Sequence, residues 1–171
     1  MYLQLTHRRQ YAYSRRNEDV RVRNLCGESE TTYAYNTNGR LSQLLVKTTD
    51  GVITKYVYGI GLIGEETSGS FKTYHFDYRG STAAITDING NVTDTFEYDT
   101  YGNLVSRTGT SAVIFLYNGR DGVVTDRNGL IYMRARYYSP ELRRFINADI
   151  IAGNISDSVT LNRYAYANGN P

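Results

Sequence analysis

Residues that could bind a metal or act as a nucleophile are few and widely separated in this 171-residue chain. The two histidines, His7 and His75, lie far apart, and Cys26 is the single cysteine. Metal sites built from histidine and cysteine need several ligands at short spacings, which these three residues do not supply. The sequence therefore predicts no metal and no cofactor, and we interpret Cys26 as a structural or incidental thiol.

Several aspartates stand in turn-like stretches, namely Asp50, Asp87, Asp99 and Asp121. Turn aspartates can bind calcium, but the chain has no 12-residue loop of the EF-hand type. Aspartates in turns more commonly accept hydrogen bonds from their own backbone, and we expect that role here. The chain also lacks a G-x-S-x-G motif, a phosphate-binding loop and a dinucleotide fingerprint.

Aromatic pairs spaced two residues apart organise the whole chain. They recur about every twenty residues as Tyr11/Tyr13, Tyr33/Tyr35, Tyr56/Tyr58, Phe76/Tyr78, Phe96/Tyr98 and Phe115/Tyr117. Aromatics two apart on a strand point to the same face of a sheet. Dipeptides such as Asn38-Gly39 and Asp50-Gly51 lie between the pairs and favour tight hairpin turns. A repeat of this length is typical of a stacked array, and a tyrosine-rich antiparallel sandwich is the alternative.

The predicted fold is all-β, with stacked antiparallel hairpins forming a curved, open piece of a β-shell. One face is expected to carry the inward aromatics, which pack the sheet or face a cargo: Tyr35, Tyr58, Phe76, Tyr78, Phe96, Tyr98 and Tyr117. A short helical turn is expected at 139–144, where Ser139 can cap it and Pro140 suits its first position. A second turn is expected within the loop 150–161. Open edge strands predict self-association.

Charge and hydropathy set few limits on function. The net charge is +2, but arginines crowd the first 23 residues, which a nucleic acid or an anionic lipid could contact. We favour a solvated face and predict no nucleic-acid partner. No run approaches the 18 apolar residues of a membrane-spanning helix, and the N-terminal MYLQLTHRRQ has no signal-peptide core. The chain is thus either cytosolic, or exported by a signal on a larger protein.

Three blocks of the sequence resemble the RHS, or YD-repeat, family. YAYNTNGRL (33–41) and FEYDTYGNL (96–104) follow its Y-x-Y-D-x-x-G-x-L repeat. In the first of these blocks, Asn36 stands where the repeat has its aspartate. The stretch 74–105 resembles the start of the RHS repeat-associated core. NGLIYMRARYYSPELRRFINADI (128–150) resembles its central signature and NRYAYANGNP (162–171) its closing stretch.

The resemblance implies a β-shell that spirals round a hollow interior, is capped by the core and holds a toxin domain that follows the core. It divides the chain into a degenerate N-terminal repeat or arm (1–30), a hairpin array (31–127) and a truncated cap segment (128–171). The cap is expected to use Arg134, Arg136, Tyr137, Tyr138 and Arg144. The implied partners are an upstream repeat shell and a downstream toxin of a larger RHS protein, which is secreted or displayed at the cell surface.

The resemblance also implies an aspartyl autoprotease that needs two aspartates in Asp-Pro-x-Gly motifs. Asp149 stands where the first belongs, but Ile150-Ile151-Ala152 follows it, and the chain stops where the second would lie. Paired carboxylates are required so that one is protonated while the other acts as a base. Asp149 is thus either a surviving half-site or an ordinary loop carboxylate, and Asp157 is a stand-in without supporting context.

Three functions remain open from the sequence. The first is a shell and cap fragment that contains or presents a toxin. The second is a remnant of the self-cleaving aspartyl protease. The third is a surface module that binds carbohydrate or protein through its tyrosines.

Overall fold

A computed structural model describes residues 3–6, 9–13, 21–26, 29–38, 41–151, 156, 158–169 and 171. It consists of two antiparallel sheets in which neighbouring strands follow one another in the chain. The first sheet has eleven strands and the second has four. This architecture confirms the predicted all-β fold of successive hairpins. Among the described residues no helix is both long and apolar enough to cross a membrane.

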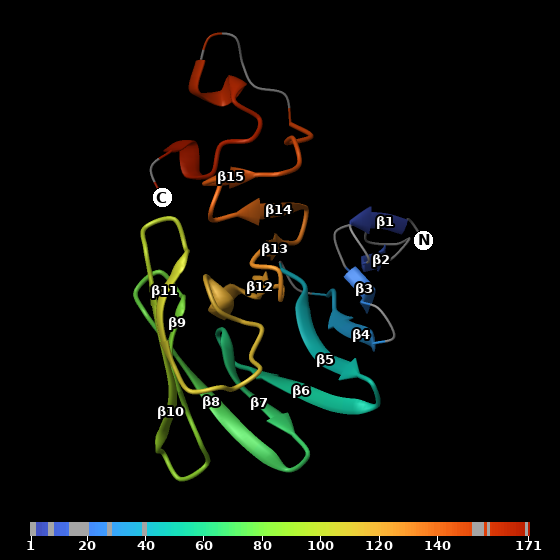
Figure 1. The fold of residues 1–171 in the computed structure, drawn as a ribbon, viewed down its shortest axis with the longest axis vertical. Coiled ribbons are helices and arrows are strands. Elements are labelled where there is room, and N and C mark those ends of the chain that lie inside the picture. Colours follow the sequence, from blue (N-terminus) through green and yellow to red (C-terminus); the bar gives the residue numbers. More distant parts are fainter. Residues whose placement is uncertain are drawn as a thin grey trace.

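The eleven-stranded sheet is a meander that curves strongly, so that its first and last strands stand on opposite sides of the molecule (Figure 1). Its strands are β1 (Leu3–Thr6), β2 (Arg9–Tyr13), β3 (Arg21–Cys26), β4 (Ser29–Asn36), β5 (Gln43–Thr49), β6 (Val52–Tyr58), β7 (Leu62–Thr67), β8 (Ser70–Phe76), β9 (Thr82–Thr86), β10 (Val92–Tyr98) and β11 (Leu104–Thr108). Strands β1–β3 thus belong to the same sheet as the repeats that follow them, and its strand pairing ends at Thr108.

A bulge recurs at the same place in successive repeats. The register shifts immediately before the second aromatic of a pair, at Tyr13, Tyr35, Tyr58, Phe76 and Tyr98. A bulge bends its strand and increases the local twist. Because every second strand bends at an equivalent point, the sheet curves steadily toward its aromatic face.

Two turn designs recur among the described hairpins. Asp77, Asp87 and Asp99 each accept hydrogen bonds through Oδ1 from the backbone N–H groups two and four residues ahead, at 2.8–2.9 Å. A glycine with positive φ follows each of these aspartates three residues later. The predicted role of turn aspartates is confirmed for Asp87 and Asp99.

The other design is a two-residue turn with positive φ at both positions. Asp50 and Gly51 have φ of 49° and 82°, and Ser68 and Gly69 have φ of 52° and 79°. These values are typical of the type I′ turns that match the twist of a hairpin. The turn predicted at Asn38-Gly39 lies partly outside the described residues, because Gly39 is not among them.

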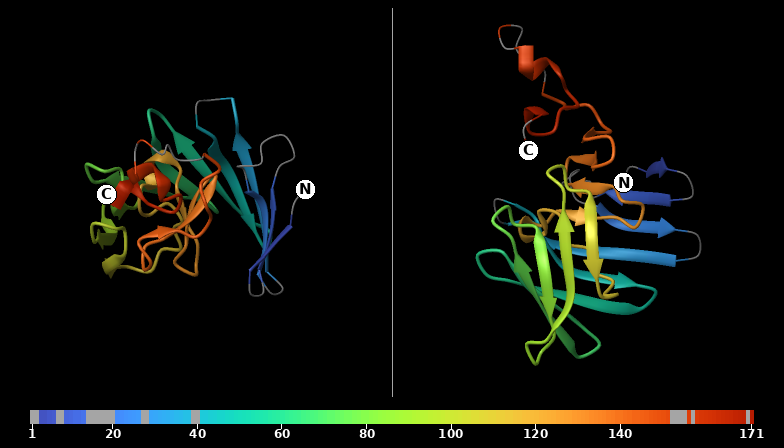
Figure 2. Two further views of the ribbon diagram at one scale, coloured as in Figure 1. Left: turned by 90° about the horizontal axis from the view of Figure 1, so that it is seen from above. Right: turned by 60° about the vertical axis from the view of Figure 1, so that its left-hand side comes forward.

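After Thr108 the chain leaves the sheet. Residues 109–123, here called the crossing segment, run over the concave face and include the short 3₁₀ helix η1 (Gly119–Asp121). They lead into the second sheet, made of β12 (Val124–Thr125), β13 (Ile131–Met133), β14 (Arg136–Ser139) and β15 (Arg144–Phe145). Two more 3₁₀ helices follow, η2 (Ser158–Leu161) and η3 (Ala167–Gly169). Figure 2 shows β12 and β13 between the two sides of the curved sheet.

One local expectation needs correction. The stretch around Phe115 was expected to form another hairpin of the array, but it has no strand pairing and instead covers the sheet. Residues 139–144 form the expected single turn, between β14 and β15, with Ser139 as its cap. The Arg143 N–H donates to the Pro140 carbonyl at 3.1 Å, and the Leu142 N–H donates to Ser139 Oγ at 3.2 Å. The helical turn expected within 150–161 is present as η2.

Candidate functional site

The concave side of the first sheet carries a ladder of aromatic rings, here called the aromatic face. The first ring of each central pair is buried, with 5%, 4% and 4% of its surface exposed in Tyr56, Tyr74 and Phe96. The second members are partly buried against the same core: Tyr35, Tyr58, Phe76 and Tyr98. Burial raises the pKa of the Tyr58 and Tyr98 hydroxyls, so these rings stay neutral.

The crossing segment lies directly on this face. Phe115 is fully buried, and its ring meets Tyr56 edge-on, with ring centroids 5.0 Å apart and planes at 89°. The ring of Tyr74 lies 6.5 Å from Phe115 at 77°. Such edge-to-face pairs contribute about 0.5–1.5 kcal/mol beyond the burial of their area. The chain thus covers the central part of its aromatic face with its own backbone.

Asp94 on β10 holds the start of the crossing segment. Its carboxylate is 1% exposed and accepts hydrogen bonds from the Ser111 N–H (2.9 Å), Thr93 Oγ1 (2.9 Å) and Arg107 Nη2 (3.4 Å). Burial opposes ionisation, but these bonds outweigh it and keep the pKa of Asp94 below its usual value. Gly109 has φ of 72°, and a Cβ there would lie 2.3 Å from the Thr93 carbonyl and 2.5 Å from the Asp94 carboxylate. Only glycine fits this approach without a backbone shift.

The start of β9 holds the middle of the crossing segment. Thr82 Oγ1 donates to the Phe115 carbonyl at 2.7 Å, and the Thr82 N–H donates to the Leu116 carbonyl at 3.0 Å. The Asn118 N–H donates to Ser81 Oγ at 3.1 Å. Ser81 and Thr82 are fully buried, so these bonds are shielded from water.

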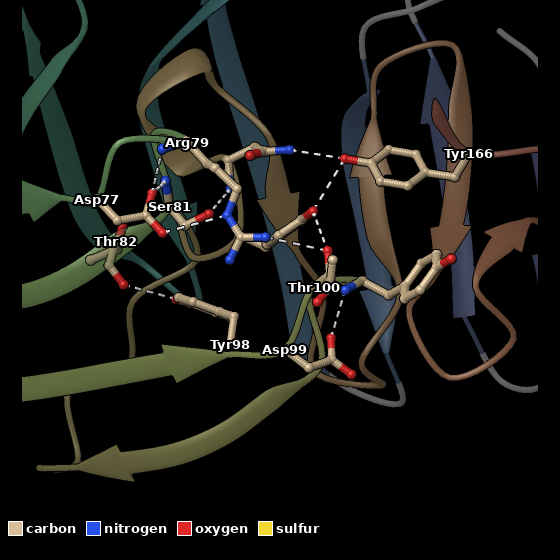
Figure 3. Close-up of polar contacts among 11 residues, drawn as sticks. Asp77, Arg79, Ser81, Thr82, Tyr98, Asp99, Thr100 and Tyr166 are labelled. Carbon is tan, nitrogen blue, oxygen red and sulfur yellow. Dashed lines mark hydrogen bonds and ion pairs between the residues drawn. The ribbon is translucent and has the colours of Figure 1, made fainter. Parts of the chain in front are cut away.

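Two hairpin turns, the crossing segment and the C-terminal part converge at one junction (Figure 3). The Asn118 Nδ2 group donates to the Tyr166 hydroxyl at 3.2 Å, and that hydroxyl donates to the Tyr117 hydroxyl at 3.4 Å. The Tyr117 hydroxyl and Arg79 Nη1 both donate to the Thr100 carbonyl, at 3.4 and 3.3 Å. This chain of bonds connects the turns after β8 and β10 to Tyr166 in the closing stretch.

A second aromatic cluster seats the C-terminal part on this junction. Tyr138 is fully buried, its hydroxyl donates to the Tyr101 carbonyl at 2.8 Å, and its ring centroid lies 4.3 Å from that of Tyr166. Gly102 permits the close packing, because a Cβ there would lie 2.7–2.9 Å from the Tyr117 ring. Burial raises the pKa of the Tyr117 and Tyr138 hydroxyls.

The structure changes one of the expected aromatic pairs. Tyr78 is 90% exposed in the turn after β8, so it does not belong to the aromatic face. The inward pair of that repeat is Tyr74/Phe76, whose rings stack at 6.1 Å and 13°. Asp77 follows this pair as Asp99 follows Phe96/Tyr98, and this alignment is the sequence signal that identifies it. Tyr117 is buried as expected, but from the crossing segment rather than from a strand.

Asp149 lies between two arginines that come from distant parts of the C-terminal segment. Its Oδ2 pairs with Arg136 Nη1 at 2.9 Å, and its Oδ1 accepts the Ile151 N–H at 3.0 Å. The guanidinium of Arg163 donates to the Asp149 carbonyl, and the Asp149 N–H donates back to the Arg163 carbonyl at 2.8 Å. Arg163 was not recognised from the sequence, and Asp157 lies outside the described residues. The arrangement ties β14 to the closing stretch.

The expected cap residues gather around the second sheet. The Arg136 guanidinium lies 3.5 Å from the centroid of the Phe145 ring, and Arg144 lies 4.7 Å from that of Tyr164. Arg134 donates to the Asp121 carbonyl. Tyr137 is buried and packs against Tyr132, with centroids 5.3 Å apart. Cation–π and aromatic contacts of this kind fasten strands of a small sheet.

The described part of the chain contains no group of three or more His, Cys, Asp or Glu side chains that could hold a metal ion. Its one strongly buried glutamate is Glu65 on β7, which is 5% exposed. Glu65 accepts a hydrogen bond from the Tyr74 hydroxyl at 2.9 Å and lies 3.9 Å from Lys72. Burial raises the pKa of Glu65, although Tyr74 and the lysines Lys47 and Lys72 oppose the shift.

Comparison with known proteins places these features in context. No family model matches the chain. It is 31% identical over 157 residues to the tRNA3(Ser)-specific nuclease WapA of Bacillus spizizenii, a match of 88% of this chain and 7% of that protein. It is 30% identical over 168 residues to the tRNA nuclease WapA of Bacillus subtilis, covering 82% of this chain and again 7% of the relative. The chain thus spans about 7% of the length of these curated relatives.

The fold also has a close counterpart among solved structures. The crystal structure of TcdB2-TccC3-Cdc42 superposes with a TM-score of 0.67 at 19% identity, over 95% of this chain and 8% of that one. The likeness extends from the curved sheet to the closing segment, because it covers nearly the whole chain. In sequence and in fold, the chain is related to RHS-type toxin proteins.

Proposed function

We propose that this chain is a wall-and-closure segment of a larger RHS-type toxin protein, and that it contributes part of a container for a toxin domain. The observation that carries the proposal is the regular bulge at the second aromatic of each repeat, which curves a continuous sheet of eleven strands. A sheet curved in this way is suited to a wall, and it extends by adding hairpins at a free edge.

Closure is the second part of the proposal. The crossing segment and the second sheet fill the concave side, and the junction of Tyr117, Tyr138 and Tyr166 fixes the C-terminal part above the last hairpins. A chain that continues beyond Pro171 would therefore start from a rigid point at the end of the wall. The larger protein would be secreted or displayed at the cell surface, with an upstream repeat shell and a downstream toxin as the partners.

Two features bear on the alternatives. The Asp149 carboxylate is engaged by Arg136 Nη1 at 2.9 Å and by the Ile151 N–H, contacts that favour a structural role over a catalytic one. The aromatic rings expected to form a sugar-stacking platform are largely covered by the crossing segment, with Tyr78 as the exposed exception. Neither alternative is favoured by a specific contact.

The test uses the larger RHS-type protein that contains this segment. In the wild type, trypsin should cleave slowly within the polypeptide segment that follows Pro171. It should cleave it quickly when Gly102→Val, which drives a side chain into the Tyr117 ring, opens the junction. Gly129→Val is the matched control, since its glycine also has positive φ but nothing lies within 4 Å of its Cβ position. Equal cleavage of the wild type and Gly102→Val would reject containment.

A further inference from the structure

A cavity of about 690 Å³ lies between the concave face of β4–β8 and the crossing segment with the strand that follows it. This volume is in the range of small-molecule sites. Hydroxyl groups line it on both sides, from the sheet and from the covering segment: Thr31, Thr49, Thr54, Thr67, Ser111 and Thr125. Hydroxyl groups thus reach this space from both sides, next to the aromatic core.

Most charges around this cavity are compensated. Lys72 lies 3.9 Å from Glu65, and Arg107 lies 3.4 Å from Asp94. Asp50 accepts hydrogen bonds from Ser29 Oγ and the Glu30 N–H.

Lys47 is different. It lies on β5 opposite Thr54, which is buried on the concave face, and its side chain lines the cavity. Among the residues that the structure describes, no hydrogen bond or ion pair engages the Lys47 ammonium group. Burial lowers the pKa of Lys47, and only Glu65 among its charged neighbours opposes that effect. A cation withdrawn from water without a close partner is destabilising, so an anion bound beside it would be favoured.

We propose that this cavity binds a carboxylate through the ammonium group of Lys47, with the threonine hydroxyls contacting the polar body of the ligand. Arg127 also lines the cavity, but it is exposed to solvent, so Lys47 is the cation withdrawn from water and can hold a single carboxylate. Two sources share this chemistry: a free hydroxylated acid, and a glutamate or aspartate side chain on a polypeptide lying against the wall. The site does not depend on the containment role, so the two proposals can fail separately.

Isothermal titration of the full chain separates these sources. The first arm uses glucuronate, with glucose as its neutral counterpart. The second uses a glycine-serine peptide with one central glutamate, with the glutamine peptide as its counterpart. We expect an acidic probe to bind at least about tenfold more tightly than its neutral counterpart, in line with a charge-assisted hydrogen bond. Equal binding of each pair, or no binding of either acid at millimolar concentrations, would overturn the proposal, as would tighter binding of inorganic phosphate.

Lys47→Met should reduce the affinity for the acidic probe by at least about tenfold. Lys55→Met is the matched control, because Lys55 lies on the outer face in an ion pair with Glu66 at 3.3 Å. It should leave binding unchanged. If Lys47→Met does not fold, Lys47→Gln provides the same readout. An affinity that survives the loss of the Lys47 charge would overturn the assignment.

Discussion

Replacing Gly109 by alanine should release the crossing segment from the sheet. Alanine at a positive φ costs about 1–2 kcal/mol on its own. The new Cβ would also lie 2.3 Å from the Thr93 carbonyl, so the backbone must move away from Asp94. That movement breaks the bond from the Ser111 N–H to a buried carboxylate, which is worth roughly 1.5–3 kcal/mol. We therefore expect Gly109→Ala to lower the free energy of unfolding by about 3–5 kcal/mol.

Gly90→Ala is the control that isolates the clash from the backbone effect. Gly90 has φ of 83°, close to the 72° of Gly109, but nothing lies within 4 Å of its Cβ position. Gly90→Ala should therefore lower the free energy of unfolding only through the unfavourable positive φ, by about 1–2 kcal/mol. Urea unfolding of both variants can be followed by tyrosine fluorescence, since the chain has 17 tyrosines and no tryptophan. If the two variants lose unfolding free energies that agree within about 0.5 kcal/mol, the proposed anchoring of the crossing segment is refuted.

Three further predictions concern single side chains. Glu65 has a raised pKa when folded, so its stabilising contribution is present below the ordinary pKa of about 4.3 and is lost as pH rises through the raised value. Glu65→Gln should thus gain stability relative to the wild type as pH rises from 4 to 7 in urea titrations, and a constant difference would contradict the shift. Asp149→Asn should lower the free energy of unfolding by about 1 kcal/mol and speed exchange of the backbone amide at position 149, which donates to the Arg163 carbonyl. Asp121→Asn, in an exposed ion pair, should change neither quantity. Equal effects of the two substitutions would mean that Asp149 does not fasten the C-terminal segment. Tyr74→Ala should lower the free energy of unfolding by about 3–5 kcal/mol, and Tyr78→Ala by under about 0.5 kcal/mol, in thermal unfolding. The reverse order would show that Phe76/Tyr78, and not Tyr74/Phe76, is the inward pair.

The hairpin array was predictable because its signals are local. Each repeat contains its aromatic pair and its turn residues within about twenty positions, and the positive φ of Asp50 and Gly51 follows directly from the dipeptide. The aromatic pair of one repeat was predicted wrongly as Phe76/Tyr78, since both Tyr74/Phe76 and Phe76/Tyr78 satisfy the two-residue spacing. Only the aspartate that opens the turn distinguishes them, because its side chain must follow the last residue of the strand.

The covering of the sheet could not be predicted in the same way. Phe115 and Tyr117 have the spacing of a strand pair, but their position depends on contacts with residues more than thirty positions away, such as Thr82. The pairing of Asp149 with Arg136 and Arg163 is also non-local, although it spans fewer positions. No local propensity encodes such contacts, so the sequence indicated the elements of the cap without indicating how they close on the sheet.

The central claim is that the chain covers its own aromatic face, and nuclear Overhauser effects from the Phe115 ring test it most directly. We expect cross-peaks from Phe115 ring protons to both Tyr56 and Tyr74, whose ring centroids lie 5.0 and 6.5 Å away. A Phe115 ring without contacts to either tyrosine, in a chain whose strands remain paired, would contradict it.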